Sequence, residues 1–254
     1  MTDSIYSDTP TMLEGIISVQ AAVKAKKRYI KNVYIDKTKY EKRDRKITHF
    51  ISFLKNEGIS FILAERQDID SLSTGTSHGG VVAEVGDYSF SDLEEILKKL
   101  GSGEYLVMLD GVEDPFNFGY SIRNLFAFGC CGFIIPERNW MSAANVVSTS
   151  SAGASEICDM SISKNDDELV KLIHDNGIDI VCSALSSTSI SLFEFKPEKP
   201  FVLFIGGEKR GISKTFMENA DKVVHIPYSN DNAKYSLPTA SCAAIFGSYL
   251  SSIK

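Results

Sequence analysis

Hydrophobic and polar positions in the first third of the chain follow two different periods, and this predicts a mixed α/β module. Apolar residues recur at helical spacing in residues 14–26, and Ile47, Ile51 and Leu54 form one stripe of a second helix. Short β-branched runs alternate with these helices and predict extended structure. The predicted strands are residues 32–35, 59–63 and 79–85.

The rest of the chain is predicted to be buried strands separated by helices. Continuous apolar strands that alternate with helices favour a parallel sheet covered on both faces, with its ligand site at the carboxyl ends of the strands. The predicted strands are residues 105–109, 132–135, 178–182, 201–205 and 223–226. The predicted helices are residues 119–128, 143–151, 166–176, 213–219 and 237–252.

A charged helix at residues 91–100, with Ser91 as its predicted cap, is followed by the break Gly101-Ser102-Gly103. We therefore expect a small α/β domain over residues 10–88, a linker over 89–103 and a parallel-sheet domain over 104–254.

Charge is distributed unevenly between these parts. The 254 residues carry 27 basic and 33 acidic side chains, a net charge of −6, and 43% of them are hydrophobic, which excludes global disorder. Residues 20–46 nevertheless hold eleven Lys or Arg against three acids, a local charge of +8, so the remaining chain carries −14. The basic segment Lys24 to Lys46 is thus a candidate surface for nucleic acid, although a solvated helix face is the commoner role of such a run.

Other simple signals exclude several classes of protein. No stretch approaches the roughly 20 apolar residues of a membrane span, and the polar, acidic start does not resemble a signal peptide, so we expect a cytoplasmic protein. The five cysteines form no CxxC pair and have no nearby His at metal-ligand spacing. We expect reduced thiols and no metal site, and we expect the four histidines to be structural.

The first of three unusual loops covers residues 110–119 and follows a predicted strand. It leads into a helix for which Asn117 is a plausible cap, while Gly119 lets the backbone approach a ligand. Arg123, further along this helix, could hold a phosphate with its planar guanidinium. A capped helix with an ion-paired surface Arg explains the same pattern.

The second loop, residues 206–211, follows another strand and matches neither a Walker A loop nor GxGxxG, so an ordinary turn is also possible. The absence of a phosphate loop argues against a nucleotide-binding α/β enzyme of another kind. The third loop follows Ile226 and Pro227. Ser236 fits a helix N-cap and Pro238 a first turn, or the hydroxyl could hold an anion or an incoming hydroxyl.

Taken in order, the three loops resemble the motifs of the SpoU (TrmH-type) RNA ribose 2′-O-methyltransferases of the SPOUT superfamily. The N-x-G-x-x-x-R motif matches Asn117, Gly119 and Arg123. The G-x-E-x-x-G motif matches residues 206–211, and Ile-Pro with a later Ser-Leu matches residues 226–237. Residues 13–21, 78–83 and 151–156 also resemble family segments, the first two belonging to a ribosomal-protein-like RNA-binding domain carried by many members.

This resemblance implies a deep trefoil knot in the last third of the chain, a homodimer and S-adenosylmethionine as cofactor. It implies that the cofactor is held by backbone groups at residues in or beside the second and third motifs and after the preceding strand. These residues are Ala184, Leu185, Gly206, Gly207, Ile226 and Leu237.

The resemblance also implies the catalytic set Arg123, Asn117, Glu208 and Ser236. A guanidinium has a pKa above about 12, so Arg123 is expected to clamp the RNA phosphate and hydroxyl rather than act as the base. Asn117 would orient Arg123 or the ribose, Glu208 would fix the loop, and Ser236 would hydrogen-bond the attacking hydroxyl.

The third motif departs from the family at Pro238, where other members have Asn, and its loop is about two residues longer. Proline offers neither a side-chain amide nor a backbone N–H, so a hydrogen bond is lost there. The expected function is S-adenosylmethionine-dependent 2′-O-methylation of structured RNA, rRNA more than tRNA and 23S rRNA foremost. The alternative is a catalytically impaired RNA-binding or ribosome assembly factor.

Overall fold

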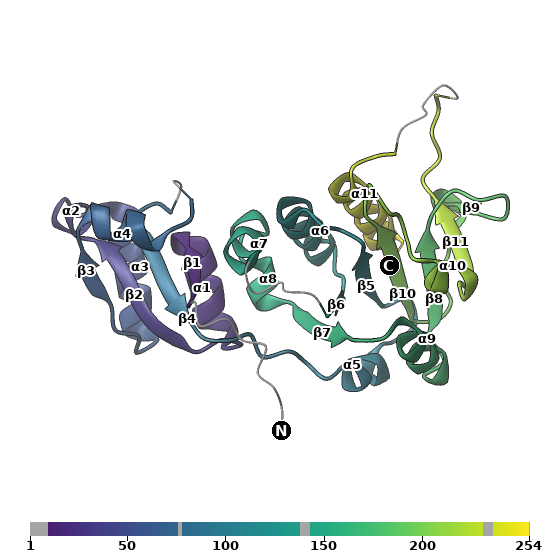
Figure 1. The fold of residues 1–254 in the computed structure, drawn as a ribbon, viewed down its shortest axis with the longest axis horizontal. Coiled ribbons are helices and arrows are strands. Elements are labelled where there is room, and N and C mark those ends of the chain that lie inside the picture. Colours follow the sequence, from purple (N-terminus) through teal and green to yellow (C-terminus); the bar gives the residue numbers. More distant parts are fainter. Residues whose placement is uncertain (1–9, 76–77, 138–142, 231–235, 254) are drawn as a thin grey trace. The chain divides into compact units, whose positions relative to one another are not determined.

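The computed structural model describes residues 10–75, 78–137, 143–230 and 236–253, which form two compact units (Figure 1). The first unit comprises residues 1–89 and 139–157, and the second comprises residues 90–138 and 158–254. The first therefore includes a segment from within the predicted parallel-sheet domain. The predicted domain and linker ranges stay a prediction.

A four-stranded sheet forms the centre of the first unit, with the strand order β1-β4-β2-β3. β1 and β2 pair antiparallel with β4, whereas β3 pairs parallel with β2. Its strands are β1 (Thr11–Glu14), β2 (Ile30–Asp36), β3 (Ile62–Ala64) and β4 (Val81–Val85). Its helices are α1 (Gly15–Ala25), α2 (Lys37–Glu41), α3 (Arg45–Asn56), α4 (Arg66–Leu72), α7 (Ala144–Ser150) and α8 (Ala154–Ile157).

The core of this unit lies between α1, α3 and the sheet. The predicted stripe Ile47, Ile51 and Leu54 is buried on α3 together with Phe50, which confirms the period read from the sequence. Asp44 caps this helix by accepting hydrogen bonds from the backbone N–H groups of Lys46 and Ile47.

Two buried carboxylates join α7 and α8 to the rest of the first unit. Glu14, at the start of α1, accepts hydrogen bonds from the backbone N–H of Thr74 and from Nδ2 of Asn145, over 2.7 and 2.6 Å. Glu156 on α8 pairs with Arg28 over 2.7 Å, and both side chains are almost fully buried. Arg28 is consequently part of the interior of this unit, and the expectation that the whole segment Lys24 to Lys46 is a docking surface is wrong at this residue.

The second unit is built on a seven-stranded sheet with the order β7-β6-β5-β10-β8-β11-β9, and its neighbouring strands all pair parallel. The α/β fold with a parallel sheet is thus confirmed, and the knot stays a prediction. Its strands are β5 (Tyr105–Asp110), β6 (Gly132–Pro136), β7 (Asp159–Ser163), β8 (Asp179–Ser183), β9 (Ile190–Ser191), β10 (Phe201–Gly206) and β11 (Lys222–His225).

Helices cover both faces of this sheet. α5, α9 and α10 pack on the face that carries Met108 and Phe204, whereas α6 and α11 pack together on the other side (Figure 1). The helices are α5 (Leu93–Lys99), α6 (Pro115–Ala127), α9 (Asp166–Asp175), α10 (Lys214–Glu218) and α11 (Thr239–Ser252), with the 3₁₀ turn η2 (Leu192–Glu194). No helix in the described ranges is long and apolar enough to cross a membrane.

Three predicted caps are wrong. α5 is capped by the side chain of Asp92 rather than Ser91, and α6 is capped by Asp114, with Pro115 as its first residue, rather than by Asn117. α11 begins directly after Pro238, which has no side-chain cap bond, so Ser236 is not its cap. The side chains of Asn117 and Ser236 therefore do not cap these helices.

Candidate functional site

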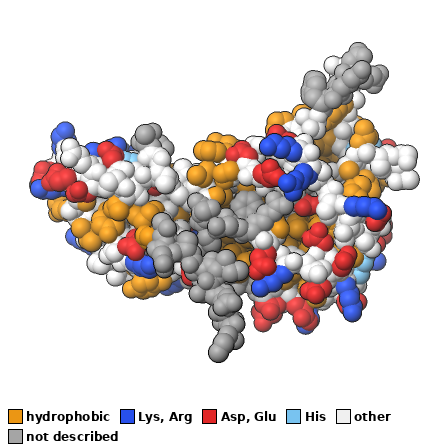
Figure 2. Space-filling model, viewed as in Figure 1, with side chains coloured by type: hydrophobic (Ala, Val, Ile, Leu, Met, Phe, Trp, Pro, Cys, Tyr) orange, Lys and Arg blue, Asp and Glu red, His pale blue; other side chains and the backbone are white. Residues whose placement is uncertain are grey.

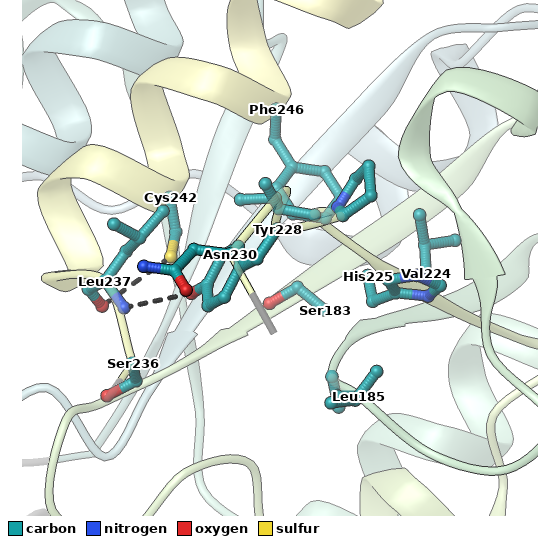
Figure 3. A pocket seen from close by; sticks show the side chains of 13 residues that line it. Ser183, Leu185, Val224, His225, Tyr228, Asn230, Ser236, Leu237, Cys242 and Phe246 are labelled. Atoms are coloured by element: carbon teal, nitrogen blue, oxygen red, sulfur yellow. Dashed lines mark hydrogen bonds between the residues drawn. The ribbon is translucent and has the colours of Figure 1, made fainter. Parts of the chain in front are cut away.

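A cavity of about 700 Å³ opens at the carboxyl ends of β8 and β11, where the parallel sheet is expected to hold its ligand (Figure 3). Most of its wall is apolar, with Ser183, Asn230 and Ser236 among its polar groups. The lining residues are Ser183, Ala184, Leu185, Val224, His225, Ile226, Pro227, Tyr228, Asn230, Ser236, Leu237, Cys242 and Phe246.

The loops after β11 and before α11 meet in this cavity. The backbone N–H of Leu237 donates a hydrogen bond to the hydroxyl O of Tyr228 over 3.2 Å, and the thiol of Cys242 lies 3.7 Å from the carbonyl O of Leu237 (Figure 3). Both backbone polar groups of Leu237 therefore have partners. The position of this peptide is fixed by one residue on each side of the loop.

Four of the six residues predicted to hold a cofactor line the cavity, namely Ala184, Leu185, Ile226 and Leu237. Gly206 and Gly207 do not line it. A Cβ on Gly206 would lie 2.6 Å from the carbonyl C of Gly211, and one on Gly207 would overlap the carbonyl O of Gly111. Gly206 lets the loop after β10 close on itself, and Gly207 lets the loops after β5 and β10 pack backbone against backbone.

Asn117 and Glu208 come together beside these packed loops. β5 and β10 pair in register from Phe201 with Tyr105 to Gly206 with Asp110, so the loops that follow them leave the sheet side by side. Nδ2 of Asn117 donates to Oε1 of Glu208 over 3.1 Å. The two residues line a hollow of about 90 Å³ together with Asp114 and Thr239. The Thr239 hydroxyl also donates to the carbonyl O of Gly206 over 3.2 Å.

Arg123 is not hydrogen-bonded to Asn117 or Glu208. It lies six residues after Asn117 on α6, which places it about 240° further around the helix axis. Its side chain is exposed, and within the described residues it has no ion-pair partner. Phe116 and Tyr120, at helical spacing on the same stripe as Arg123, are also exposed, by 53% and 45%.

Burial affects two thiols near the site, that of Cys242 on the cavity wall and that of Cys182 within β8. Burial raises the pKa of the Cys242 thiol above its ordinary value, and burial raises the pKa of Cys182, in β8, to about 12. All five cysteines are free, as predicted, and no cluster of metal-ligating side chains occurs in the described part of the chain. Tyr228, Asn230, Cys242 and Phe246 were not predicted as site residues, although the first two follow β11 and the last two lie one turn apart on α11.

Models of two protein families match the chain. Residues 104–247 match the SpoU rRNA methylase family, and residues 12–91 match the substrate-binding domain of RNA 2′-O ribose methyltransferases. α7 and α8 lie within the first range, yet they pack in the same unit as the second.

Curated relatives share slightly more than a quarter of their residues with this chain. The 23S rRNA (guanosine-2′-O-)-methyltransferase RlmB of Shewanella oneidensis is 28% identical over 235 residues, which cover 91% of this chain and 94% of that protein. An uncharacterized tRNA/rRNA methyltransferase of Mycobacterium sp. strain KMS is 29% identical over 201 residues, 78% of this chain. The chain spans 64% of the length of that relative.

Solved structures share the fold at low identity. An AdoMet-bound rRNA methyltransferase from Sinorhizobium meliloti superposes with a TM-score of 0.76 at 20% identity, covering 94% of this chain and 86% of that one. The SpoU methyltransferase AviRb from Streptomyces viridochromogenes, in complex with AdoMet, gives 0.76 at 19% identity over 95% and 89%. With the family model covering more than half of its length, the chain belongs to the SpoU rRNA methylase family.

Proposed function

We propose that this protein transfers a methyl group from S-adenosylmethionine to a ribose 2′-hydroxyl of structured RNA. The observation that carries the proposal is the convergence of three sequence motifs at one edge of the sheet. The second and third supply Glu208 and the wall around Leu237, and the first supplies Asn117, which is bonded to Glu208. The relatives that are methyltransferases of rRNA support the same activity.

The cavity at the ends of β8 and β11 fits S-adenosylmethionine. Its volume of about 700 Å³ is in the usual range for a cofactor site, and its apolar wall suits an adenine ring and a thioether chain. The backbones at Ala184, Leu185, Ile226 and Leu237 would hold it, while Gly206 and Gly207 would act by shaping the adjoining loops. When bound, the cofactor supplies a methyl group on a positively charged sulfur, which is a good leaving group.

The side chains around this cavity would align the hydroxyl and assist loss of its proton. Ser236 lines the cavity and is not used as a helix cap, so its hydroxyl is available to bond the attacking 2′-hydroxyl. Asn117 and Glu208 would fix the loop beside it. Arg123 would clamp the RNA phosphate as a bidentate donor.

We also propose that the protein works as a homodimer. Phe116, Tyr120 and Arg123 form an exposed stripe on α6, and large exposed aromatic side chains are typical of interface cores. A second copy packed on this stripe would bury both rings and give Arg123 a site in the partner, which its own chain does not provide.

The RNA is proposed to be ribosomal, most specifically 23S rRNA, and the protein to act in the cytoplasm. The match of residues 12–91 to a substrate-binding domain and the similarity to RlmB over 94% of that enzyme support this choice over tRNA. Pro238 favours a second candidate, an RNA-binding or ribosome assembly factor with impaired catalysis, because it removes one donor from the third motif.

Incubation with labelled S-adenosylmethionine and total RNA tests both candidates. Transfer of label to rRNA, at a ribose and lost in Arg123→Ala, is the expected result. No transfer, together with cofactor binding by calorimetry and RNA binding by filter retention, would favour the impaired factor. No transfer and no binding of either ligand would contradict both.

A further inference from the structure

The cations of the basic segment occupy two places in the first unit, separated by the length of β2. β2 contains seven residues, which places its ends about 20 Å apart. Lys24, Lys26 and Lys31 lie near its start. Lys42, Arg43, Arg45 and Lys46 lie beyond its end, on the corner between α2 and α3, and we call these four residues the α2–α3 corner.

Acidic partners neutralise the two places differently. Near the start of β2, Arg28 is buried against Glu156 and Lys31 pairs with Glu84 at 3.5 Å, whereas Lys24 and Lys26 are exposed and form no ion pair with a described residue. All four cations of the α2–α3 corner are exposed, and none forms an ion pair with any described residue. Figure 2 shows blue and red side chains together at the α2 end of this unit, and the corner is distinguished by four unpaired cations within residues 42–46.

The acids nearest in sequence to the corner are already engaged. The Asp44 carboxylate accepts the backbone N–H groups of Lys46 and Ile47 as the cap of α3, and the charge of Glu41 acts on Lys37. Lys37 itself pairs with Glu65 at 2.9 Å. The four cations of the corner also outnumber these two nearby carboxylates, so the corner keeps a net positive charge.

The backbone concentrates this charge further. Arg45 and Lys46 occupy the first turn of α3, where the helix dipole is positive and acidic residues are normally favoured. Arg43 has a φ of +52°, a conformation that is costly for a residue with a side chain, at the tight turn between the two helices. Tyr40, 45% exposed, adds an aromatic face beside these cations. Positive charge at a helix N-terminus is stabilised by a bound anion, and the Tyr40 ring offers a face on which a base can stack.

We propose that the α2–α3 corner is the surface of this domain that grips the RNA phosphate backbone, with Tyr40 stacking on an unpaired base. This inference rests on the proposed function for its choice of RNA as the polyanion. RNA docking is thereby assigned to the second half of the segment Lys24 to Lys46 and not to the whole segment.

The test is a neutral triple variant, Lys42→Gln, Arg45→Gln and Lys46→Gln, compared with Lys24→Gln, Lys26→Gln and Lys55→Gln. The control residues are also exposed, lie in the same unit and have no ion-pair partner among the described residues. Affinity for 23S rRNA transcribed in vitro is measured from 0.05 to 1 M KCl, with circular dichroism to check folding. Losing three phosphate contacts flattens the slope of log K against log salt by about 2–3 and weakens binding about 100-fold at 0.1 M.

The expected result is this loss in the corner variant, convergence of the affinities at 1 M salt, and a change below threefold in the control. A corner variant within threefold of the wild type, or a control that loses as much, would overturn the corner as the docking surface. In either case RNA binding by the wild type leaves the proposed function intact, whereas a wild type that binds no RNA contradicts the proposed function itself. Tyr40→Leu tests the stacking step, with an expected loss of about tenfold that persists at high salt.

Discussion

Variants of the buried ion pair between Arg28 and Glu156 test whether this pair holds α8 in the first unit. Nε of Arg28 lies 2.7 Å from Oε2 of Glu156, and the two side chains are only 5% and 3% exposed. The guanidinium also donates to the carbonyl O of Gly86 over 3.1 Å and lies over the Tyr88 ring, 5.1 Å from its centroid. Glu156→Leu would leave this guanidinium buried without its counter-charge.

Removing one partner of a buried ion pair costs about 3–5 kcal/mol, because the remaining charge stays desolvated. We expect Glu156→Leu to lower the free energy of unfolding of the first unit by about 3 kcal/mol, since Gly86 and Tyr88 still contact Arg28. Arg28→Met should cost less, because burial raises the pKa of Glu156 and the isolated carboxyl takes up a proton. The double variant should return to within about 1 kcal/mol of the wild type.

The raised pKa of Glu156 also determines how the stability of the Arg28→Met variant depends on pH. In Arg28→Met the folded state binds the Glu156 proton more tightly than the unfolded chain, so stability is lost as the pH rises from the ordinary value of 4.5 through the raised pKa. The double variant has no carboxyl at this position and should lack that loss.

Amide hydrogen exchange, read by mass spectrometry on peptides from α1 and β2, measures the stability of this unit separately from the second. Glu65→Leu is the control, because Glu65 pairs with Lys37 on an exposed surface of the same unit, where an ion pair contributes little to stability. A cost below about 1 kcal/mol for Glu156→Leu, or a double variant as unstable as the two single changes added, would refute the reasoning.

Three further predictions concern packing, the site and its thiols. Gly153→Ala should lower the free energy of unfolding, measured in urea, by about 2 kcal/mol, because φ is +80° and the new Cβ would lie 2.6 Å from that of Ala21. The control Gly177→Ala, at φ +69° with open space around the new Cβ, should lower it by about half as much. Asn117→Ala should lower kcat at least tenfold in steady-state methylation with the cofactor KM unchanged, since Glu208 loses its partner; an unchanged kcat would exclude this role. At pH 8 iodoacetamide should leave Cys182 unmodified until the protein unfolds, and S-adenosylmethionine should slow the reaction of Cys242, as mass spectrometry can follow.

The strands and helices that pack the two cores could be predicted because their apolar period is strong, as in Tyr105–Asp110 and on α3. Three strands were not predicted: β9, which has only two residues, and β1 and β7. β1 has only four residues and ends at Glu14, a carboxylate buried by partners far away in the sequence. β7 carries alternating serines, and Ser161 is buried because its hydroxyl donates to the carbonyl O of Ser91.

Within the candidate site, the sequence predicted which loops form the site better than it predicted what each residue contacts. Ala184, Leu185, Ile226 and Leu237 could be placed on one cavity because they follow neighbouring parallel strands or the loop above them. The glycine pair was assigned to the ligand. In the structure Gly206 packs against Gly211 in its own loop, and Gly207 packs against Gly111, which the pairing of β5 with β10 brings near. Arg28 was counted as a surface charge for the same reason, since Glu156 is 128 residues away.

The third motif shows how a lost residue can be compensated by a neighbouring one. Pro238 supplies neither a side-chain amide nor a backbone N–H, and its side chain makes no cap bond at the start of α11. The Tyr228 hydroxyl instead accepts the N–H of Leu237, the residue just before the proline, and thereby ties the end of β11 to the start of α11. Because this bond fixes the same peptide that lines the cavity, a side chain at the opposite end of the loop maintains the shape of the cavity. The departure at Pro238 therefore affects the chemistry of one donor more than the construction of the site.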